Sequence, residues 1–229
     1  AFAAGNLKID APPQPVDTAE LERLRPALQG RALLMAASTH EGEDAIIAEA
    51  HCRLRQTLPD LCTIIAPRHP ERGPAISEML KGKGLSAARR SLGALPDRSS
   101  DAYIADTIGE LGMLYRLAPV AFIGGSLVDR GGQNPIEAVR QGAAVLTGPH
   151  WQNFSDTYDA LISNRAAIVV RSAPELASAA GQLLADRTEL GRMHARANTA
   201  LAALSGALPR TVEALLLHLP AEDGFARAS

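Results

Sequence analysis

The chain has 229 residues, of which 46% are hydrophobic, 21% are charged and 3% are aromatic, with a formal net charge of −2. This composition is ordinary for a globular protein and excludes disordered and fibrous classes. A slightly acidic chain with one Trp also lacks the basic surface and the stacking side chains of nucleic-acid-binding proteins.

Cysteine usage argues against a disulfide-rich or zinc-binding protein, and hydropathy argues against a membrane-spanning one. Cys52 and Cys62 form no CxxC pattern, which favours reduced thiols of a cytosolic protein over a disulfide or a zinc site. No run approaches the roughly 18 consecutive apolar residues that a membrane helix needs. The chain opens on "AFAAGNLKIDAPPQP", which reads as a strand end followed by a Pro-rich connector. We therefore expect a fragment of a longer protein, with any membrane contact peripheral or made by sequence outside it.

Short apolar runs alternate with helical patterns along the whole chain. The apolar runs predict strands at 32–36, 62–66, 102–104, 120–123, 143–146 and 167–170, with one further weak strand within 81–100. Helical patterns fall at 44–56, 75–83, 109–117, 135–141, 154–163, 174–185, 186–204 and 209–219. Because the strand runs are continuously apolar, both faces of the sheet should be covered by helices. The order predicts an α/β fold with a Rossmann-like, doubly wound parallel sheet.

Ligands of such sheets bind beyond the carboxyl ends of the strands, so the loops after the strands are the candidate site. The loop "STHEGED" after the first strand offers Ser38 or Thr39 as a helix cap that presents its amides to a phosphate. A plain capping box of Ser38 with Glu41 explains the same residues without a ligand. His40 and Glu41 begin a zinc-protease motif, but its second His is absent, so no metal is expected.

The next two loops carry an arginine and a second candidate turn. In "APRHPER", the planar guanidinium of Arg68 is suited to pairing with a phosphate or carboxylate, although a solvated basic turn is the alternative. In "ADTIGEL", a capping box of Thr107 with Glu110 needs no ligand, whereas a functional turn would direct the amides near Ile108 and Gly109 at a nucleotide.

The fourth loop, "FIGGSLVDRGGQNPIE", joins a strand to a helix start. Its glycine pairs would let the backbone approach a ligand, and Asn134 can cap a helix whose first turn holds Pro135. Exposed amides at such a helix start favour a phosphate. Glu137 would lie one turn inside, within reach of a sugar hydroxyl, or serve as an ordinary capping acid. The pattern is not GxGxxG, so an NAD site gains little support.

Read in order, "GNLKID", "STHEGED", "PRHPER", "RRS", "DTIGEL", "GGSLVDRGGQNPIEA" and "GPHWQNFSD" resemble the 3-deoxy-D-manno-octulosonic acid (Kdo) transferases. The resemblance implies a GT-B glycosyltransferase of two facing Rossmann-like domains, of which this chain would be the carboxyl-terminal, donor-binding one and inactive alone. It implies CMP-Kdo as donor and a lipid A precursor as acceptor, in lipopolysaccharide synthesis at the cytoplasmic face of the bacterial inner membrane. It implies no metal, no cofactor and no nucleic acid, with membrane contact through the missing amino-terminal part.

The resemblance also assigns roles to residues. Those that would meet the CMP moiety are Arg68, His69, Thr107, Ile108, Gly109 and Glu110, while Asn134, Pro135, Ile136 and Glu137 would hold the phosphate and ribose. Those that would line the cleft near the Kdo moiety are Ser38, Thr39, Glu41, Gly124, Gly125, Ser126, Gly131, Gly132 and Gln133. The carboxylate base of the family lies in its amino-terminal domain, so no catalytic residue is assigned here. Gln133 departs from the family's usual His, and Asp44 from a more usual Glu.

With the resemblance, the chain divides into an interdomain linker at 1–17, a nucleotide-sugar-binding domain at 18–205, and a C-terminal helix with a frayed tail at 206–229. Two other functions stay open. One is a GT-B glycosyltransferase or sugar-nucleotide epimerase domain that uses a UDP-sugar. The other is a non-catalytic α/β interaction module whose loops are only structural caps.

Overall fold

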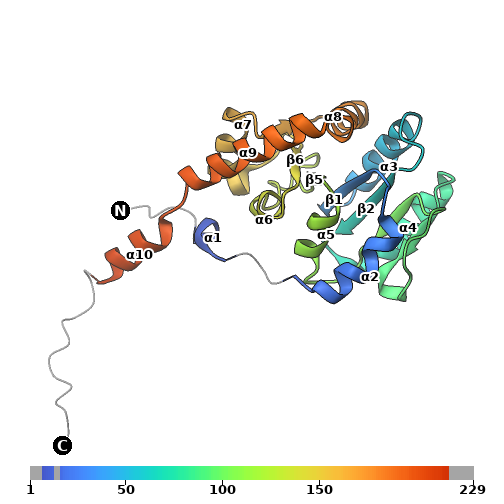
Figure 1. Cartoon of the computed structure of the whole chain (residues 1–229), viewed down its shortest axis with the longest axis horizontal. Coiled ribbons are helices and arrows are strands. Elements are labelled where there is room, and N and C mark those ends of the chain that lie inside the picture. The colour runs from blue at the N-terminus through green and yellow to red at the C-terminus, as the bar shows by residue number, and fades with distance from the viewer. Residues whose placement is uncertain (1–6, 13–15, 217–229) are drawn as a thin grey trace, which may run out of the picture.

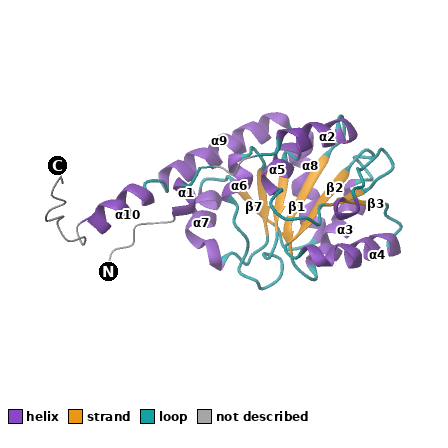
Figure 2. Cartoon of the chain, turned by 90° about the horizontal axis from the view of Figure 1, so that it is seen from below, coloured by secondary structure: helices purple, strands orange, loops and turns teal. Residues whose placement is uncertain are grey.

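The computed structural model describes residues 7–12 and 16–216, which form an all-parallel sheet of seven strands between two layers of helices (Figures 1 and 2). The strands are β1 (Leu33–Thr39), β2 (Cys62–Pro67), β3 (Ala87–Arg89), β4 (Ala102–Ile104), β5 (Val120–Ile123), β6 (Ala144–Thr147) and β7 (Ala167–Val169). The helices are α1 (Leu7–Asp10), α2 (Thr18–Leu28), α3 (Glu43–Leu54), α4 (Gly73–Gly82), α5 (Leu111–Leu117), α6 (Ile136–Arg140), α7 (Ser155–Ser163), α8 (Ala173–Ala185), α9 (Arg187–Ala203) and α10 (Ala207–Leu216). Short 3₁₀ turns lie at Pro70–Arg72, Arg90–Leu92 and Gln152–Phe154.

The strand order is β3-β4-β2-β1-β5-β6-β7. β2, β3 and β4 all lie on one side of β1, with β4 inserted between β2 and the edge strand β3, and the chain then returns to place β5 on the other side of β1. The direction of winding therefore reverses between β1 and β5, which is the switch point where doubly wound folds bind ligands. The predicted fold class is confirmed, including the weak strand, which is β3.

Two apolar layers, one on each face of the sheet, explain the continuously apolar strands. Met35 of β1 points into the layer under α2, α5, α6, α7 and α9, whereas its neighbours Leu34 and Ala36 point into the layer under α3, α4 and α8. Successive side chains of a strand point to opposite faces, so all residues of the central strand β1 except the half-buried Ser38 are buried. The layers hold the strand ends, and hence the loops that follow them, in fixed positions.

The first described residues differ from the prediction. Leu7–Asp10 form α1 and not the end of a strand. The Asp10 carboxylate accepts hydrogen bonds from the amides of Gly206 (2.8 Å) and Leu208 (2.6 Å) at the start of α10. The guanidinium of Arg140, in α6, donates to the carbonyl oxygens of Ile9 and Ala11, the latter at 2.6 Å. These tertiary contacts, which a local pattern does not encode, fix α1 beside α10 and α6 (Figure 1).

Helix α2 has no counterpart among the predicted elements. Asp17 caps it by accepting from the amides of Ala19 and Glu20, both at 3.0 Å, and Pro26 lies inside it. An internal proline ordinarily ends a helical pattern, which hides this helix from sequence reasoning. The predicted helix at 209–219 corresponds to α10. Most of the predicted linker (1–6 and 13–15) and the end of the predicted tail (217–229) lie outside the described residues.

Candidate functional site

The four loops singled out from the sequence meet in one pocket of about 480 Å³ at the carboxyl ends of β1, β2, β4 and β5. The pocket is lined by Ser38, Ala66, Pro67, Arg68, His69, Pro70, Glu71, Thr107, Ile108, Gly109, Leu111, Tyr115, Gln133, Asn134 and Glu137. Thr39, Glu41, Glu110, Gly124, Gly125, Ser126, Gly131, Gly132, Pro135 and Ile136 were also expected in the site but do not line this pocket. The pocket at the switch point of the sheet thus brings together nine of the expected site residues, and the other ten lie outside its lining.

The β2 loop presents Arg68 and His69 at the pocket. The amide of Arg68 donates to the Thr39 carbonyl oxygen at 3.0 Å, which fastens the loop to the end of β1. The Arg68 side chain is exposed, and within the described part of the chain no hydrogen bond or ion pair engages its guanidinium. An unpaired, planar cation at the mouth of a pocket is suited to a phosphate or carboxylate ligand.

Thr39 and Asp44 serve the framework beneath that loop. Thr39 is fully buried and donates its hydroxyl to Asp44 Oδ1 at 2.7 Å. Arg72 donates to the Thr39 carbonyl oxygen at 3.0 Å and forms an ion pair with Asp44. Both polar groups of Thr39 are therefore engaged within the protein.

The β4 loop contributes Thr107, Ile108 and Gly109. Ile108 is 85% exposed and Gly109 has φ of +89°, a conformation that glycine adopts without strain. The predicted capping box is absent, because the Thr107 hydroxyl bonds to the Glu110 carboxylate itself and Glu110 makes no side-chain cap. The Glu110 carboxylate turns away to Arg90. An apolar side chain and free backbone, without the Glu110 carboxylate, thus face the pocket from this loop.

The glycines of the fourth loop allow backbones to pack against one another. A side chain at Gly124 would come within 2.5 Å of the Ser38 carbonyl oxygen, and one at Gly132 within 2.8 Å of the His150 carbonyl oxygen. Ser126 is buried between them, donating to the Ile123 carbonyl oxygen at 2.5 Å and accepting from the Gly148 amide at 2.7 Å. These close contacts leave no space for a side chain at Gly124 or Gly132.

Glu43 is the residue of this region that sequence reasoning missed. It is fully buried, and its carboxylate accepts hydrogen bonds from the amides of His40 (2.8 Å), Gly125 (2.7 Å), Ser126 (3.0 Å) and Leu127 (2.9 Å). It therefore joins the loop after β1 to the glycine loop after β5. The capping box predicted for Ser38 with Glu41 is wrong, because α3 starts at Glu43 with no side-chain cap. The spacing of a capping-box acid was present in the sequence, but it belongs to Glu43, three residues after His40, and not to Glu41.

Asn134 and Glu137 occupy the start of α6. Asn134 Oδ1 accepts from the Ile136 amide at 3.0 Å, but α6 begins at Ile136 with Pro135 at its N-cap position, one residue later than predicted. Glu137 lines the pocket, and burial raises the pKa of its carboxyl. A side chain at Gly112 would come within 2.9 Å of Glu137 Oε1, so this glycine makes room for the carboxylate. Within the described residues no hydrogen bond satisfies the Glu137 carboxylate, which makes it available to ligand hydroxyls.

A histidine that was set aside with the zinc motif also reaches this region. His40 Nε2 lies 3.2 Å from the side-chain nitrogen of Gln133, and the rings of His40 and His69 meet edge to face with centroids 6.0 Å apart. Burial lowers the pKa of His40, and the charges of His69, Arg130 and Arg72 act in the same direction. His40 is therefore neutral near pH 7 and accepts a hydrogen bond from the Gln133 amide.

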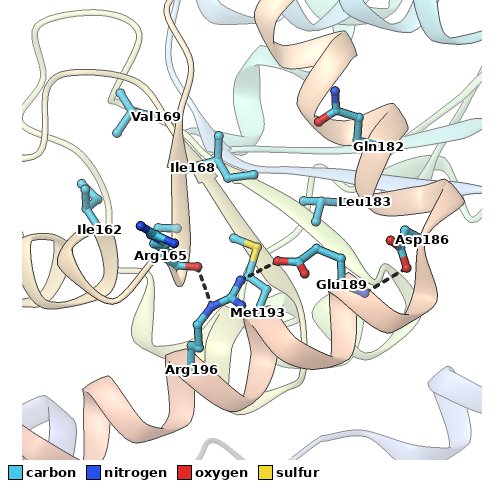
Figure 3. Close-up of a pocket in the computed structure, with 11 residues that line it drawn as sticks. Ile162, Arg165, Ile168, Val169, Gln182, Leu183, Asp186, Glu189, Met193 and Arg196 are labelled. Atoms are coloured by element: carbon cyan, nitrogen blue, oxygen red, sulfur yellow. Dashed lines mark hydrogen bonds and ion pairs between the residues drawn. The ribbon is translucent and has the colours of Figure 1, made fainter.

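A larger cavity of about 900 Å³ lies elsewhere, between β7, α8 and α9 (Figure 3). Three of its charged residues, Asp186, Glu189 and Arg196, are used within the protein. Arg196 pairs with Glu189 at 2.6 Å and donates to the Arg165 carbonyl oxygen at 2.9 Å, while Asp186 accepts from the first amides of α9. This cavity borders an edge strand far from the switch point, so the smaller pocket is the candidate site.

Two general features of the described residues bear on the chemistry. They contain no group of three or more His, Cys, Asp or Glu side chains placed to hold a metal ion. None of the helices formed by residues 7–12 and 16–216 is both long enough and apolar enough to cross a membrane.

No family model matches the chain. A 3-deoxy-D-manno-octulosonic acid transferase from Haemophilus influenzae is 34% identical over 217 residues, covering 94% of this chain and 51% of the relative. One from Bordetella pertussis is 40% identical over 190 residues, covering 81% of this chain and 44% of the relative. The chain thus spans about half the length of the curated relatives that it matches.

A solved structure matches over nearly its whole length. The crystal structure of the C-terminal CMP-Kdo binding domain of WaaA from Acinetobacter baumannii is 31% identical, with a TM-score of 0.76, and the match covers 80% of this chain and 96% of that one. Further structural neighbours are glycosyltransferase domains of the GT-B type. The chain therefore belongs to the 3-deoxy-D-manno-octulosonic acid transferase family, in which it corresponds to a C-terminal domain of GT-B type.

Proposed function

We propose that this chain binds CMP-Kdo in the pocket at the switch point, as the donor-binding part of an enzyme that transfers Kdo to a lipid A precursor at the cytoplasmic face of the inner membrane. The observation that carries the proposal is one pocket that holds the guanidinium of Arg68 and the carboxylate of Glu137, neither of which is paired with another residue in the part of the chain that the structure describes. The first complements a phosphate and the second complements the hydroxyls of a ribose. The names of the relatives, and of the solved domain, support CMP-Kdo as the ligand.

Within this proposal each loop has a part. Arg68 and His69 contact the phosphate, the turn at Thr107–Gly109 contacts the cytidine, and Glu137 accepts from the ribose hydroxyls. The start of α6 contributes less to phosphate binding than the sequence indicates. That helix has five residues, and its Ile136 amide already donates to Asn134. Arg68 therefore carries most of the charge stabilisation.

The proposed reaction places one half of the chemistry outside this chain. A base from the amino-terminal domain deprotonates the acceptor hydroxyl, whose oxygen forms a bond to the anomeric carbon of Kdo. The bond from that carbon to the phosphate oxygen breaks, and CMP leaves with the electron pair. Arg68 stabilises the negative charge that develops on the phosphate, without a metal ion. Contact with the membrane and the acceptor belongs to the part of the enzyme that this chain does not span.

Nucleotide titration tests the proposal directly. Saturating CMP should raise the melting temperature of the chain by about 5 °C or more, because a ligand at 100 times its dissociation constant stabilises by about 2.7 kcal/mol. CMP should stabilise the chain more than UDP at equal concentration. A preference for UDP would instead identify a different GT-B enzyme, and no response to either nucleotide would identify a non-catalytic module.

Arg68→Ala should weaken CMP binding by about tenfold to a hundredfold, the equivalent of losing hydrogen bonds to a charged group worth about 1.5–3 kcal/mol. Isothermal titration with CMP and with cytidine measures this. Cytidine has no phosphate, so its affinity should not change. Arg53→Ala, an exposed arginine of α3 paired with Glu49, is the matched control. Equal weakening of cytidine and CMP would contradict the phosphate role of Arg68.

A further inference from the structure

Two consecutive arginines at the end of β3 hold the two acidic residues that flank the pocket turn 107–109. Arg89 donates to Asp106 Oδ2 through Nε at 3.0 Å and through Nη2 at 2.8 Å. Arg90 donates to Glu110 through Nε at 2.5 Å and through Nη2 to the other carboxylate oxygen. We call Arg89, Arg90, Asp106 and Glu110 the arginine bracket. None of the four lines the pocket.

The bracket is itself fixed from several directions. The Asp106 side chain is 1% exposed and also accepts from the Ser91 amide at 2.9 Å and from its hydroxyl at 2.7 Å. The Arg90 side chain is 9% exposed and donates to Glu20 of α2 at 3.0 Å and to the Tyr103 hydroxyl of β4 at 3.3 Å. Each end of the turn is therefore tied to buried framework.

The turn between those ends makes few stabilising contacts of its own. Thr107, Ile108 and Gly109 are all exposed, and among the described residues the Thr107 hydroxyl bonds only to Glu110, a member of the bracket. Gly109 has no side chain to restrict its backbone. A loop that must be ordered by its ligand lowers affinity by the entropy lost on ordering. Ordering the turn in advance removes that cost.

The acids stay charged at neutral pH. Burial alone would raise the pKa of Glu110, but the hydrogen bonds from Arg90 and Thr107 outweigh it and leave that pKa lowered. The hydrogen bond to Glu110 raises the pKa of Arg90. Burial would likewise raise the pKa of Asp106, but the hydrogen bonds from Ser91 and Arg89 outweigh burial and leave that pKa lowered.

We propose that Arg89 and Arg90 are positioning residues of the nucleotide pocket, which hold the turn at Thr107–Gly109 in its binding conformation through Asp106 and Glu110. The inference rests on the proposed function. It reassigns Glu110 from a direct CMP contact to a support of the turn. The expected effect on binding differs from that of Arg68. Displacement of this turn should weaken the binding of cytidine as much as that of CMP, whereas loss of the Arg68 side chain should weaken only the binding of CMP.

The test combines binding with amide hydrogen exchange in Arg90→Met and Arg90→Lys. Arg90→Met should weaken both CMP and cytidine about tenfold and speed amide exchange in residues 107–112, while the unfolding midpoint shows that the protein remains folded. Arg90→Lys keeps the charge but lacks the planar fork, so it should give a smaller loss in the same direction. If Arg90→Met does not fold, Arg90→Lys alone decides.

Two further variants sharpen the reading. Arg55→Met removes the 2.8 Å ion pair with Asp101 at the other end of β4, so it should leave CMP affinity and exchange in the turn unchanged. Adding Glu110→Gln to Arg90→Met should cost less than the sum of the two single changes, because the unpaired carboxylate is removed.

The outcomes separate this inference from the proposed function. The bracket role is overturned if the wild-type chain binds CMP and folded Arg90→Met binds it within a factor of about two with unchanged exchange in the turn. If the wild-type chain does not bind CMP, the proposed function has failed. In that case amide exchange in the turn tests the bracket role by itself, and unchanged exchange in Arg90→Met overturns that role.

Discussion

Glu43→Ala is expected to destabilise the chain by about 3–5 kcal/mol, the largest effect of any single change considered for this protein. The substitution leaves the amides of His40, Gly125, Ser126 and Leu127 without their shared acceptor in a fully buried position. A buried donor without an acceptor costs about 1–3 kcal/mol, and water entering the new cavity recovers part of the sum. The melting temperature should fall by about 10 °C.

Denaturant unfolding of three variants checks this expectation. Glu43→Gln retains one acceptor oxygen but turns an amide group toward backbone donors, so it should fall between the wild type and Glu43→Ala. Glu41→Ala is the matched control, because Glu41 is an exposed acid on the same loop. Loss of less than about 1 kcal/mol in Glu43→Ala would show that the two loops hold together without this carboxylate.

Glu137→Gln should stabilise the chain and weaken CMP binding by about tenfold, the ratio that corresponds to 1.4 kcal/mol. Burial raises the pKa of this carboxyl above its ordinary value near 4.5, which means that its charged form is destabilised in the fold. The neutral amide removes that penalty. It also removes an acceptor for ribose hydroxyls, so stability and affinity should move in opposite directions.

The pH dependence of the stability gain follows from the sign of the shift. Because the folded pKa is raised, the penalty of the wild-type carboxylate is fully present above the folded pKa. It disappears as pH falls through the folded pKa toward the unfolded value near 4.5. The advantage of Glu137→Gln in thermal unfolding should therefore be present at pH 7 and vanish near pH 4.

Deoxynucleotides test the binding half. The wild type should prefer CMP to its 2′-deoxy analogue, and Glu137→Gln should lose most of that preference. Glu71→Gln is the control, since Glu71 lines the same pocket but is exposed. An unchanged preference for CMP in Glu137→Gln would place the ribose elsewhere.

The fold and the location of the site could be predicted because both depend on local, periodic signals. Continuous apolar runs such as 120–123 mark strands that are buried on both faces, and a parallel sheet then forces the loops after its strands to one edge. Asn134 followed by Pro135 is a helix-start signal that needs no tertiary context, and α6 begins directly after it, at Ile136.

The misses share the opposite property, since their causes lie far away in the chain. Glu43 looks like an ordinary first-turn acid until the amide of Ser126 is known to lie beside it. Glu110 has the spacing of a capping box, but its carboxylate forms an ion pair with Arg90. Gly132 carries the signature of a ligand loop, yet the segment that approaches it is the protein's own backbone at His150.

The position of β1 has a consequence for how the site comes into being. Leu34 of β1 pairs on one side with Thr63 and on the other with Val120, so the central strand stays half unpaired until β5 has been made and delivered to it. Pairings between such distant segments form slowly, because the intervening chain must close a long loop first. The candidate pocket is therefore expected to be a late product of folding, assembled only after synthesis has passed Glu137. Until then, β1 presents an unpaired edge of the kind that is open to wrong strand pairing.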